Sequence, residues 1–320
     1  MKTNPFPYSD TNKRYYTYDY YLKQTFGGKV FKVALDAGFG CPNRDGQKGI
    51  GGCTFCSVSG SGDFAGDIQD PLDVQFEKIK AMMHHKWPVA RYIAYFQAYT
   101  NTYAPVEELK ATFEPFIGKE NVVGISIATR PDCVSEDVID YLVTIHERTH
   151  LWVELGLQTI HDTTATSFNR GYETAVFYDA VARLRRRGLR VLVHLINGFP
   201  EETTEMMMES ARAVASLDIQ GVKIHSLFVL GNSMLGRSYK KNPFPILTQE
   251  QYVDLVVRQL ECFAPHVVVQ RVTGDAPSYD LLAPKWSLKK TIVTNEIDKL
   301  MVERDTWQGK YYANHLTNHR

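Results

Sequence analysis

Residues 122–158, VVGISIATRPDCVSEDVIDYLVTIHERTHLWVELGLQ, alternate between two side-chain patterns. Val122–Ala128 and Trp152–Gln158 are short, nearly continuous apolar runs, which are typical of strands covered on both faces of a parallel sheet. Between them, Ser135 is a favourable N-cap for a helix with one apolar side. The stretch therefore predicts strand, helix and strand, the unit of a parallel α/β fold.

The same alternation continues through most of the chain. Thr248 and Gln251 form a capping box before the last of the predicted helices. About six strand–helix units, each crossing over in the right-handed sense, curl into a full or partial barrel. We therefore predict an α/β fold, a partial (β/α)6 TIM-like barrel, whose functional residues follow its strands. The further strands are expected at Val30–Asp36, Tyr92–Gln97, Arg190–Ile196, Val222–Phe228 and Val267–Val272.

The predicted barrel leaves a segment at each end of the chain. Residues 1–29 form an N-terminal extension, residues 30–275 the barrel, and residues 276–320 a C-terminal extension. The last segment carries Trp286 and several lysines, side chains suited to contact with another molecule. We expect this segment to cover the barrel or to bind substrate.

Composition limits where the protein works and what it binds. The chain has 320 residues, 44% of them hydrophobic and 22% charged, which is typical of globular proteins. It contains no apolar run near the roughly 20 residues that cross a bilayer, and no secretory pattern at its N-terminus. We therefore expect a cytoplasmic protein that does not bind membranes. Lys plus Arg and Asp plus Glu number 36 each, so the net charge predicts no polyanionic partner.

Three of the five cysteines follow the first predicted strand, in residues 36–56, DAGFGCPNRDGQKGIGGCTFC. Cys41, Cys53 and Cys56 have the spacing C-x11-C-x2-C, and the glycines between them let the backbone turn tightly around a bulky group. In a chain without a secretory pattern, such cysteines favour ligand roles over disulfides. Three thiolates leave a fourth position of a metal centre open, as a catalytic centre requires.

A structural zinc site is the alternative reading of these cysteines. Such a site needs a fourth protein ligand. Asp45, Asp63 and the distant histidines are the candidates, and none stands at a matched spacing. A zinc or iron–sulfur carrier of this kind would bind metal without catalysing a reaction.

These motifs resemble the radical S-adenosylmethionine (SAM) superfamily, in which three cysteines follow the first strand of an incomplete barrel. The wide C-x11-C-x2-C spacing is similar to that of the elongator catalytic subunit family. The segments Tyr95–Pro105, Thr129–Cys133 and Trp286–Lys290 resemble the YhcC/YtqA group, and the similarity covers almost the whole chain. The related coproporphyrinogen oxidases belong to the same superfamily.

The resemblance implies both cofactors and a mechanism. Cys41, Cys53 and Cys56 would hold a [4Fe–4S] cluster, and SAM would bind through its amino and carboxylate groups at the open iron. One electron from a flavodoxin- or ferredoxin-like donor then splits SAM, and the resulting 5′-deoxyadenosyl radical takes a hydrogen atom from substrate. The protein supplies geometry and excludes water.

Five residues match positions that contact SAM in related enzymes. Thr100 lies where a glycine-rich segment usually meets the methionine amino group. Gln158 ends a G-x-Q segment, and Arg170 matches an arginine that pairs with the SAM carboxylate. His194 or Asn197 would take the position of a polar residue at the SAM ribose.

Glu154 lies on the same side of its strand as Gly156 and Gln158, so we expect it to face the barrel interior, with either a buried partner or a substrate contact. The resemblance also suggests the substrate, tRNA, with the wobble uridine side chain as the modified group. A small molecule or cofactor precursor is the alternative substrate class.

Overall fold

The computed structural model describes residues 4–60, 62–85 and 87–312, and these form two compact units. We call residues 22–156 and 170–192 the cysteine unit. Residues 4–21, 157–169 and 193–312 form the C-terminal unit. None of the helices in the described ranges is long and apolar enough to cross a membrane.

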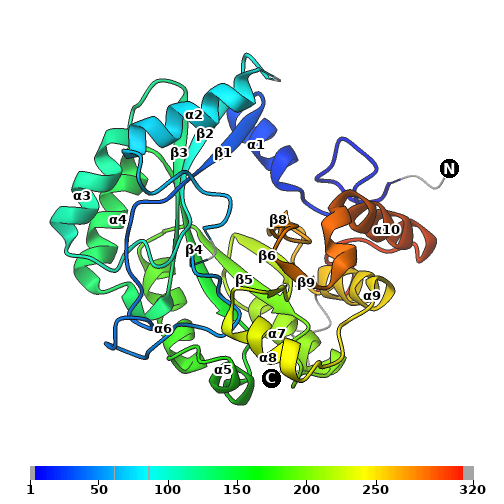
Figure 1. Ribbon diagram of the computed structural model, residues 1–320. Coiled ribbons are helices and arrows are strands. Elements are labelled where there is room, and N and C mark those ends of the chain that lie inside the picture. Colours follow the sequence, from blue (N-terminus) through cyan, green and yellow to red (C-terminus); the bar gives the residue numbers. More distant parts are fainter. Residues whose placement is uncertain (1–3, 61, 86, 313–320) are drawn as a thin grey trace. The chain divides into compact units, whose positions relative to one another are not determined.

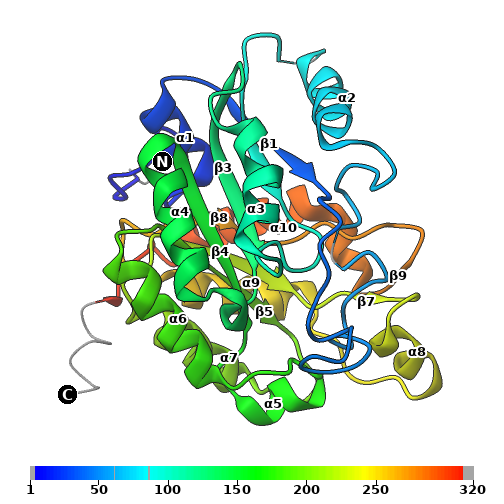
Figure 2. The same ribbon diagram turned by 90° about the vertical axis from the view of Figure 1, so that its left-hand side faces the viewer.

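The cysteine unit alternates strands and helices, as the sequence predicts (Figure 1). Figures 1 and 2 show α3 and α4 next to each other on one face of its strands. Its elements are β1 (Val30–Leu35), α2 (Leu72–His84), β2 (Arg91–Phe96), α3 (Val106–Phe113), β3 (Val122–Thr129), α4 (Glu136–Arg148), most of β4 (His150–Gln158) and α6 (Thr174–Arg186).

The C-terminal unit holds the remaining strands and most of the remaining helices. A short antiparallel pair, β7 with β9, escaped the sequence analysis because two and three residues are too few to show a period. The elements are α5 (Asp162–Ser167), most of β5 (Val191–Asn197), α7 (Thr204–Ala215), β6 (Gly221–Ser226), β7 (Val229–Leu230), α8 (Met234–Lys241), α9 (Gln249–Leu260), β8 (Val268–Arg271), β9 (Leu281–Ala283) and α10 (Lys290–Glu303); helix α1 spans Tyr18–Phe26.

The seven longer strands follow the order β1-β2-β3-β4-β5-β6-β8 in one sheet. The pairs β1–β2, β2–β3, β3–β4 and β6–β8 are parallel. Each of the seven predicted strands begins and ends within two residues of an observed one. The predicted parallel α/β fold is therefore confirmed.

The helix N-termini match the sequence predictions less consistently than the strands do. The capping box before α9 is present, because Gln251 N donates to Thr248 Oγ1 at 3.2 Å and Thr248 N to Gln251 Oε1 at 2.9 Å. Ser135 is the N-cap residue of α4, but its hydroxyl donates to Asp137 rather than capping the helix.

In the C-terminal unit, the N-terminal segment packs against the last helix. Arg14 is 1% exposed and Arg14 Nη1 donates to Asp305 Oδ1 at 3.0 Å and to Thr306 O at 3.3 Å. Lys13 pairs with Asp298 of α10. The two ends of the chain that precede and follow the predicted barrel thus contact each other.

Strands β1–β4 of the cysteine unit have two unlike faces. Phe96 packs against Phe113 of α3, with ring centroids 4.6 Å apart, so one face is covered by helices. The residues of this helix-covered face are Val33, Leu35, Ala94, Phe96, Ile125, Ile127, Val153 and Leu155, all fully buried. Because side chains alternate along a strand, the opposite face, which we call the polar face, carries Lys32, Ala34, Tyr95, Ser126, Trp152, Glu154 and Gly156.

Candidate active site

The three candidate ligands lie in one loop, between β1 and α2, at the carboxyl end of β1. A tight turn closes the C-x2-C pair, because Cys56 N donates to Cys53 O at 3.0 Å. The pKa of the Cys53 thiol lies well above its ordinary value, first because the thiol is hydrogen-bonded to Cys56 and then because the surrounding loop removes much of its contact with water. The charge of Cys41 raises this pKa further.

Asn43 joins this loop to the segment after β4. Its Nδ2 lies 3.7 Å from Cys53 Sγ. A Cβ at Gly49 would lie 2.3 Å from Asn43 Oδ1, and a Cβ at Gly171 would lie 2.5 Å from the same atom. Only glycine fits at either position, because real Cβ contacts are longer. The sequence analysis missed Asn43, whose role depends on two glycines more than 100 residues apart.

The loop after β2 lies against the cysteine loop and contains the SAM candidate Thr100. Tyr99 N donates to Gly60 O at 2.9 Å, and Thr100 N donates to Gly40 O at 3.2 Å, next to Cys41. The Thr100 hydroxyl is buried and, within the described residues, has no hydrogen-bond partner. A buried hydroxyl without a partner is costly, so this position fits a polar group that binds there.

Two arginines lie beyond this loop, around the ring of Tyr172. Arg130 follows β3; its guanidinium forms a two-bond fork with Asp132, at 2.9 and 2.8 Å, and Nη1 donates to Arg170 O at 2.9 Å. Burial lowers the pKa of Arg130, but the hydrogen bonds and charge of Asp132, together with Cys41 and Tyr172, raise it overall, so the guanidinium stays charged. That charge in turn lowers the pKa of Cys53. The sequence analysis gave Arg130 no role.

The other arginine, Arg170, is the candidate partner of the SAM carboxylate. Its side chain is 1% exposed and lies over the ring of Tyr172, with Cζ 4.4 Å from the ring centroid. Nε donates to Tyr172 O at 3.0 Å, and Nη2 donates to Thr174 Oγ1 at 2.9 Å. Arg170 thus lies in the same unit as the cysteines and Thr100, anchored to its own segment.

The other SAM candidates belong to the C-terminal unit. Gln158 ends β4 with a φ of 68°, in the left-handed region that non-glycine residues seldom occupy. Asn197 is 2% exposed, and its amide exchanges two hydrogen bonds with Gln259 of α9, at 2.8 and 2.9 Å. His194 is partly exposed, with its ring 5.6 Å from that of His225.

His194 and Asn197 lie three residues apart on β5, so their side chains project from opposite faces of the strand. Asn197 projects toward α9, where its amide is paired. A SAM contact by Asn197 stays a prediction, as does one by His194, and the strand geometry does not allow both on one face.

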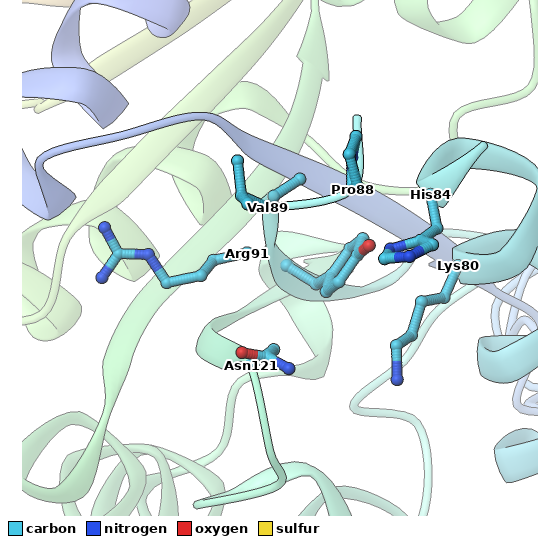
Figure 3. A pocket seen from close by; sticks show the side chains of 8 residues that line it. Lys80, His84, Pro88, Val89, Arg91 and Asn121 are labelled. Carbon is cyan, nitrogen blue, oxygen red and sulfur yellow. The ribbon is translucent and has the colours of Figure 1, made fainter. Parts of the chain in front are cut away.

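No three His, Cys, Asp or Glu side chains in the described ranges converge on one point as ligands of a single metal ion. A cubane cluster takes each thiolate on a separate iron atom, so its ligands need not converge in this way. A hollow of about 530 Å³ lies elsewhere, at the amino end of β2, lined by Lys80, His84, Arg91 and Asn121 among others (Figure 3). None of the candidate cluster or SAM residues lines it.

Comparison with known proteins defines the family. The model of the radical SAM superfamily matches residues 38–214, and that of the radical SAM C-terminal domain matches residues 219–303. The chain therefore belongs to the radical SAM superfamily, and it is an enzyme. Within the superfamily it falls in the YhcC/YtqA group. It is 53% identical to YtqA of Bacillus subtilis (strain 168), over 98% of this chain and 97% of that protein.

More distant relatives share part of the sequence or only the fold. The chain is 26% identical to the tRNA uridine(34) acetyltransferase of Methanocaldococcus infernus, over 50% of this chain and 30% of that protein. The solved structure of the Methanocaldococcus infernus Elp3 has a TM-score of 0.66 at 18% identity, over 89% of this chain and 67% of that one. The similarity to the Elp3 structure confirms a partial barrel of the radical SAM type.

The cofactors follow from the family: a [4Fe–4S] cluster and SAM. The residues of the cysteine unit fit both groups. Cys41, Cys53 and Cys56 supply soft thiolate ligands from one glycine-rich loop. Thr100 supplies a buried hydroxyl beside that loop.

Proposed function

We propose that this radical SAM enzyme modifies tRNA, at the side chain of the wobble uridine. The observation that carries the proposal is the sequence similarity of half the chain to an enzyme named for uridine 34 of tRNA. The fold shared with Elp3 agrees with it. Bound at their sites, the cluster and SAM supply reductive cleavage of SAM and abstraction of a hydrogen atom from the substrate.

The chain's own residues hold and orient these groups. Cys41, Cys53 and Cys56 are the three cluster ligands in this proposal. Thr100 and Arg170 from the cysteine unit contact SAM, the arginine as a bidentate partner for a carboxylate. Gln158 and either His194 or Asn197 contribute the remaining contacts. Of this pair we favour His194, because Gln259 already satisfies the Asn197 amide.

The proposal includes the setting of the reaction. The enzyme works in the cytoplasm and receives its electron from a flavodoxin- or ferredoxin-like protein. Residues 30–275 form the catalytic barrel, and residues 276–320 cover it or contact tRNA. The extension is already anchored within its unit, since Trp286 Nε1 donates to Leu247 O at 2.9 Å.

Isotope transfer tests the substrate. The protein is reconstituted anaerobically with iron and sulfide, reduced with dithionite, and given SAM and tRNA deuterated at the uridine side chain. Deuterium in 5′-deoxyadenosine, together with a mass change at the wobble uridine, is the expected result. Cleavage of SAM without deuterium transfer from any tRNA contradicts the tRNA proposal and leaves the enzyme class intact.

The net charge of zero favours the second candidate, a small molecule or cofactor precursor as substrate. The dependence of substrate affinity on salt concentration distinguishes the two candidate substrates. Each phosphate contact makes the slope of log affinity against log salt concentration more negative by about 0.7 to 0.9. A tRNA substrate therefore predicts a steep loss of affinity between 50 and 200 mM salt (about 10-fold or more for several contacts), and a small neutral substrate predicts almost none.

A further inference from the structure

A network of polar side chains crosses the polar face of the cysteine unit, one from each of its four strands. Lys32 of β1 forms an ion pair with Glu154 of β4. Lys32 Nζ also donates to Ser126 Oγ of β3 at 3.1 Å, and Ser126 Oγ donates to Glu154 Oε1 at 2.5 Å. The ring of Tyr95 on β2 lies beside the ammonium, with its centroid 4.0 Å from Nζ. The sequence analysis expected a partner for Glu154, and the partner is Lys32.

Exposure within this network is uneven. The Glu154 side chain is fully buried, whereas 16% of the Lys32 side chain is exposed. Ala34 and Gly156, on the same face, are also partly exposed, although Leu35 and Leu155 on the helix-covered face are not. Solvent therefore reaches this face, and there it meets the lysine and two small residues rather than the carboxylate.

The position of the pair links it to the reaction. From Lys32 to Asp36, where β1 leads into the cysteine loop, the chain rises about 13 Å at roughly 3.3 Å per residue. A lysine side chain spans a good part of that distance. Ala34, which has only a methyl group, is the one residue between Lys32 and Asp36 on this face.

A contribution to folding stability does not by itself explain why this buried ion pair is present. Removing two charges from water costs several kcal/mol for each ion, and apolar replacements of a buried pair are often neutral or stabilising. The neighbouring positions on the helix-covered face show that these strands accept apolar residues. A partly exposed cation on this face is better explained by contact with a ligand.

We propose that Lys32 anchors the substrate, by donating a hydrogen bond to a neutral carbonyl oxygen such as those of a pyrimidine ring. This inference rests on the proposed function and names the group that the enzyme recognises. The acceptor is neutral because Glu154 already balances the ammonium, so an anion would leave a net negative charge in a largely buried place. Glu154 and Ser126 are positioning residues, which hold the ammonium over Tyr95.

A double variant separates this role from a structural one. Lys32→Met alone leaves Glu154 buried without its cation, so its melting temperature falls. Lys32→Met combined with Glu154→Gln leaves no charge behind and has nearly the same volume, so its melting temperature returns close to that of the wild type. Iron content also stays at the wild-type level.

Product formation on tRNA is the decisive readout. Because the donor to the substrate is missing, the double variant forms product about 10- to 100-fold more slowly, with deoxyadenosine released in excess of product. Lys29→Met serves as the matched control: Lys29 lies three residues before Lys32, over the rings of Phe31 and Trp87, and its loss leaves product formation unchanged.

Two outcomes overturn the inference and are distinguishable. If the wild type modifies tRNA and the stable double variant does so within about threefold of its rate, Lys32 is structural and only this inference fails. If the wild type modifies no tRNA, the proposed function fails, and the inference that rests on it fails as well.

Discussion

The two faces of strands β1–β4 differ as sharply as any two regions of this molecule. The helix-covered residues named above are all apolar and fully buried, with Phe96 packed against Phe113 and Phe116. The polar face carries Lys32, Ser126 and Glu154 on the same strands, one residue away in each. The first face stabilises the fold through burial, and we propose that the second carries charges because it contacts the substrate.

Substitutions on the helix-covered face are therefore expected to have different effects from substitutions on the polar face or in the cysteine loop. A change on the helix-covered face reduces stability first and activity only as a consequence. A change at the cysteine loop, or one on the polar face that leaves no uncompensated charge, reduces activity while the fold persists.

The largest effect on activity is expected at the cysteine loop. Cys53→Ala removes one cluster ligand, so reconstituted iron falls to background and SAM cleavage is abolished. The loop is partly exposed, so the melting temperature of the protein without its cluster changes little. Cys262→Ala is the control, because Cys262 lies far from the cysteine motif in sequence. Full turnover by Cys53→Ala rejects the ligand assignment.

The largest effect on stability is expected at the helix-covered face. Phe96→Ala removes a fully buried ring between Phe113 and Phe116 and leaves a cavity, at a cost of about 3–5 kcal/mol. Urea unfolding of the protein without cofactors measures the loss. A change below about 1 kcal/mol would show that this face is not the packed core described here.

A smaller effect depends on pH and involves His150, at the start of β4. Burial lowers the pKa of His150 to about 3, and the charge of Arg190 adds to this. In the unfolded chain the pKa is about 6.5, so below that pH the unfolded chain binds a proton that the folded one does not. Stability is therefore complete above pH 6.5 and falls as pH decreases, by about 1–2 kcal/mol between pH 7 and 5.

Chemical unfolding at several pH values checks this prediction. The His150→Gln variant has no group to titrate there, so its stability depends less steeply on pH over the same range. Equal slopes for the wild type and the variant contradict the assignment to His150.

The smallest effect concerns a single hydroxyl. Thr100→Val keeps the shape of the side chain and removes an oxygen that has no partner in the described residues, so stability is unchanged or slightly higher. If that oxygen contacts SAM, the affinity for SAM falls about 3- to 10-fold. Equilibrium binding of SAM to the reconstituted enzyme measures it.

Thr102→Val gives the reverse pattern and is the control for Thr100→Val. The Thr102 hydroxyl contacts Thr129 Oγ1 at 2.5 Å and donates to Cys133 O at 2.6 Å. Its loss lowers the melting temperature by leaving buried groups without partners. If the SAM affinity of the Thr100→Val variant equals that of the wild type, the assignment of Thr100 to the SAM site is wrong.

Much of the fold could be predicted from the sequence because it depends on local patterns. The apolar runs placed every long strand within two residues, and the C-x11-C-x2-C spacing placed the cysteine loop after β1. Features that depend on distant residues were missed. Asn43 acts through Gly49 and Gly171, and Lys32, a lone charge in an apolar run, has its partner more than 120 residues away.

The central claim is that Cys41, Cys53 and Cys56 hold a cluster with one iron open to SAM. Electron paramagnetic resonance of the reduced, reconstituted enzyme, recorded with and without SAM, tests it most directly. The account predicts a [4Fe–4S] signal that changes in shape when SAM binds, followed by formation of 5′-deoxyadenosine. A signal that SAM leaves unaltered, with no cleavage product, would show that a fourth protein ligand closes the site and would contradict the account.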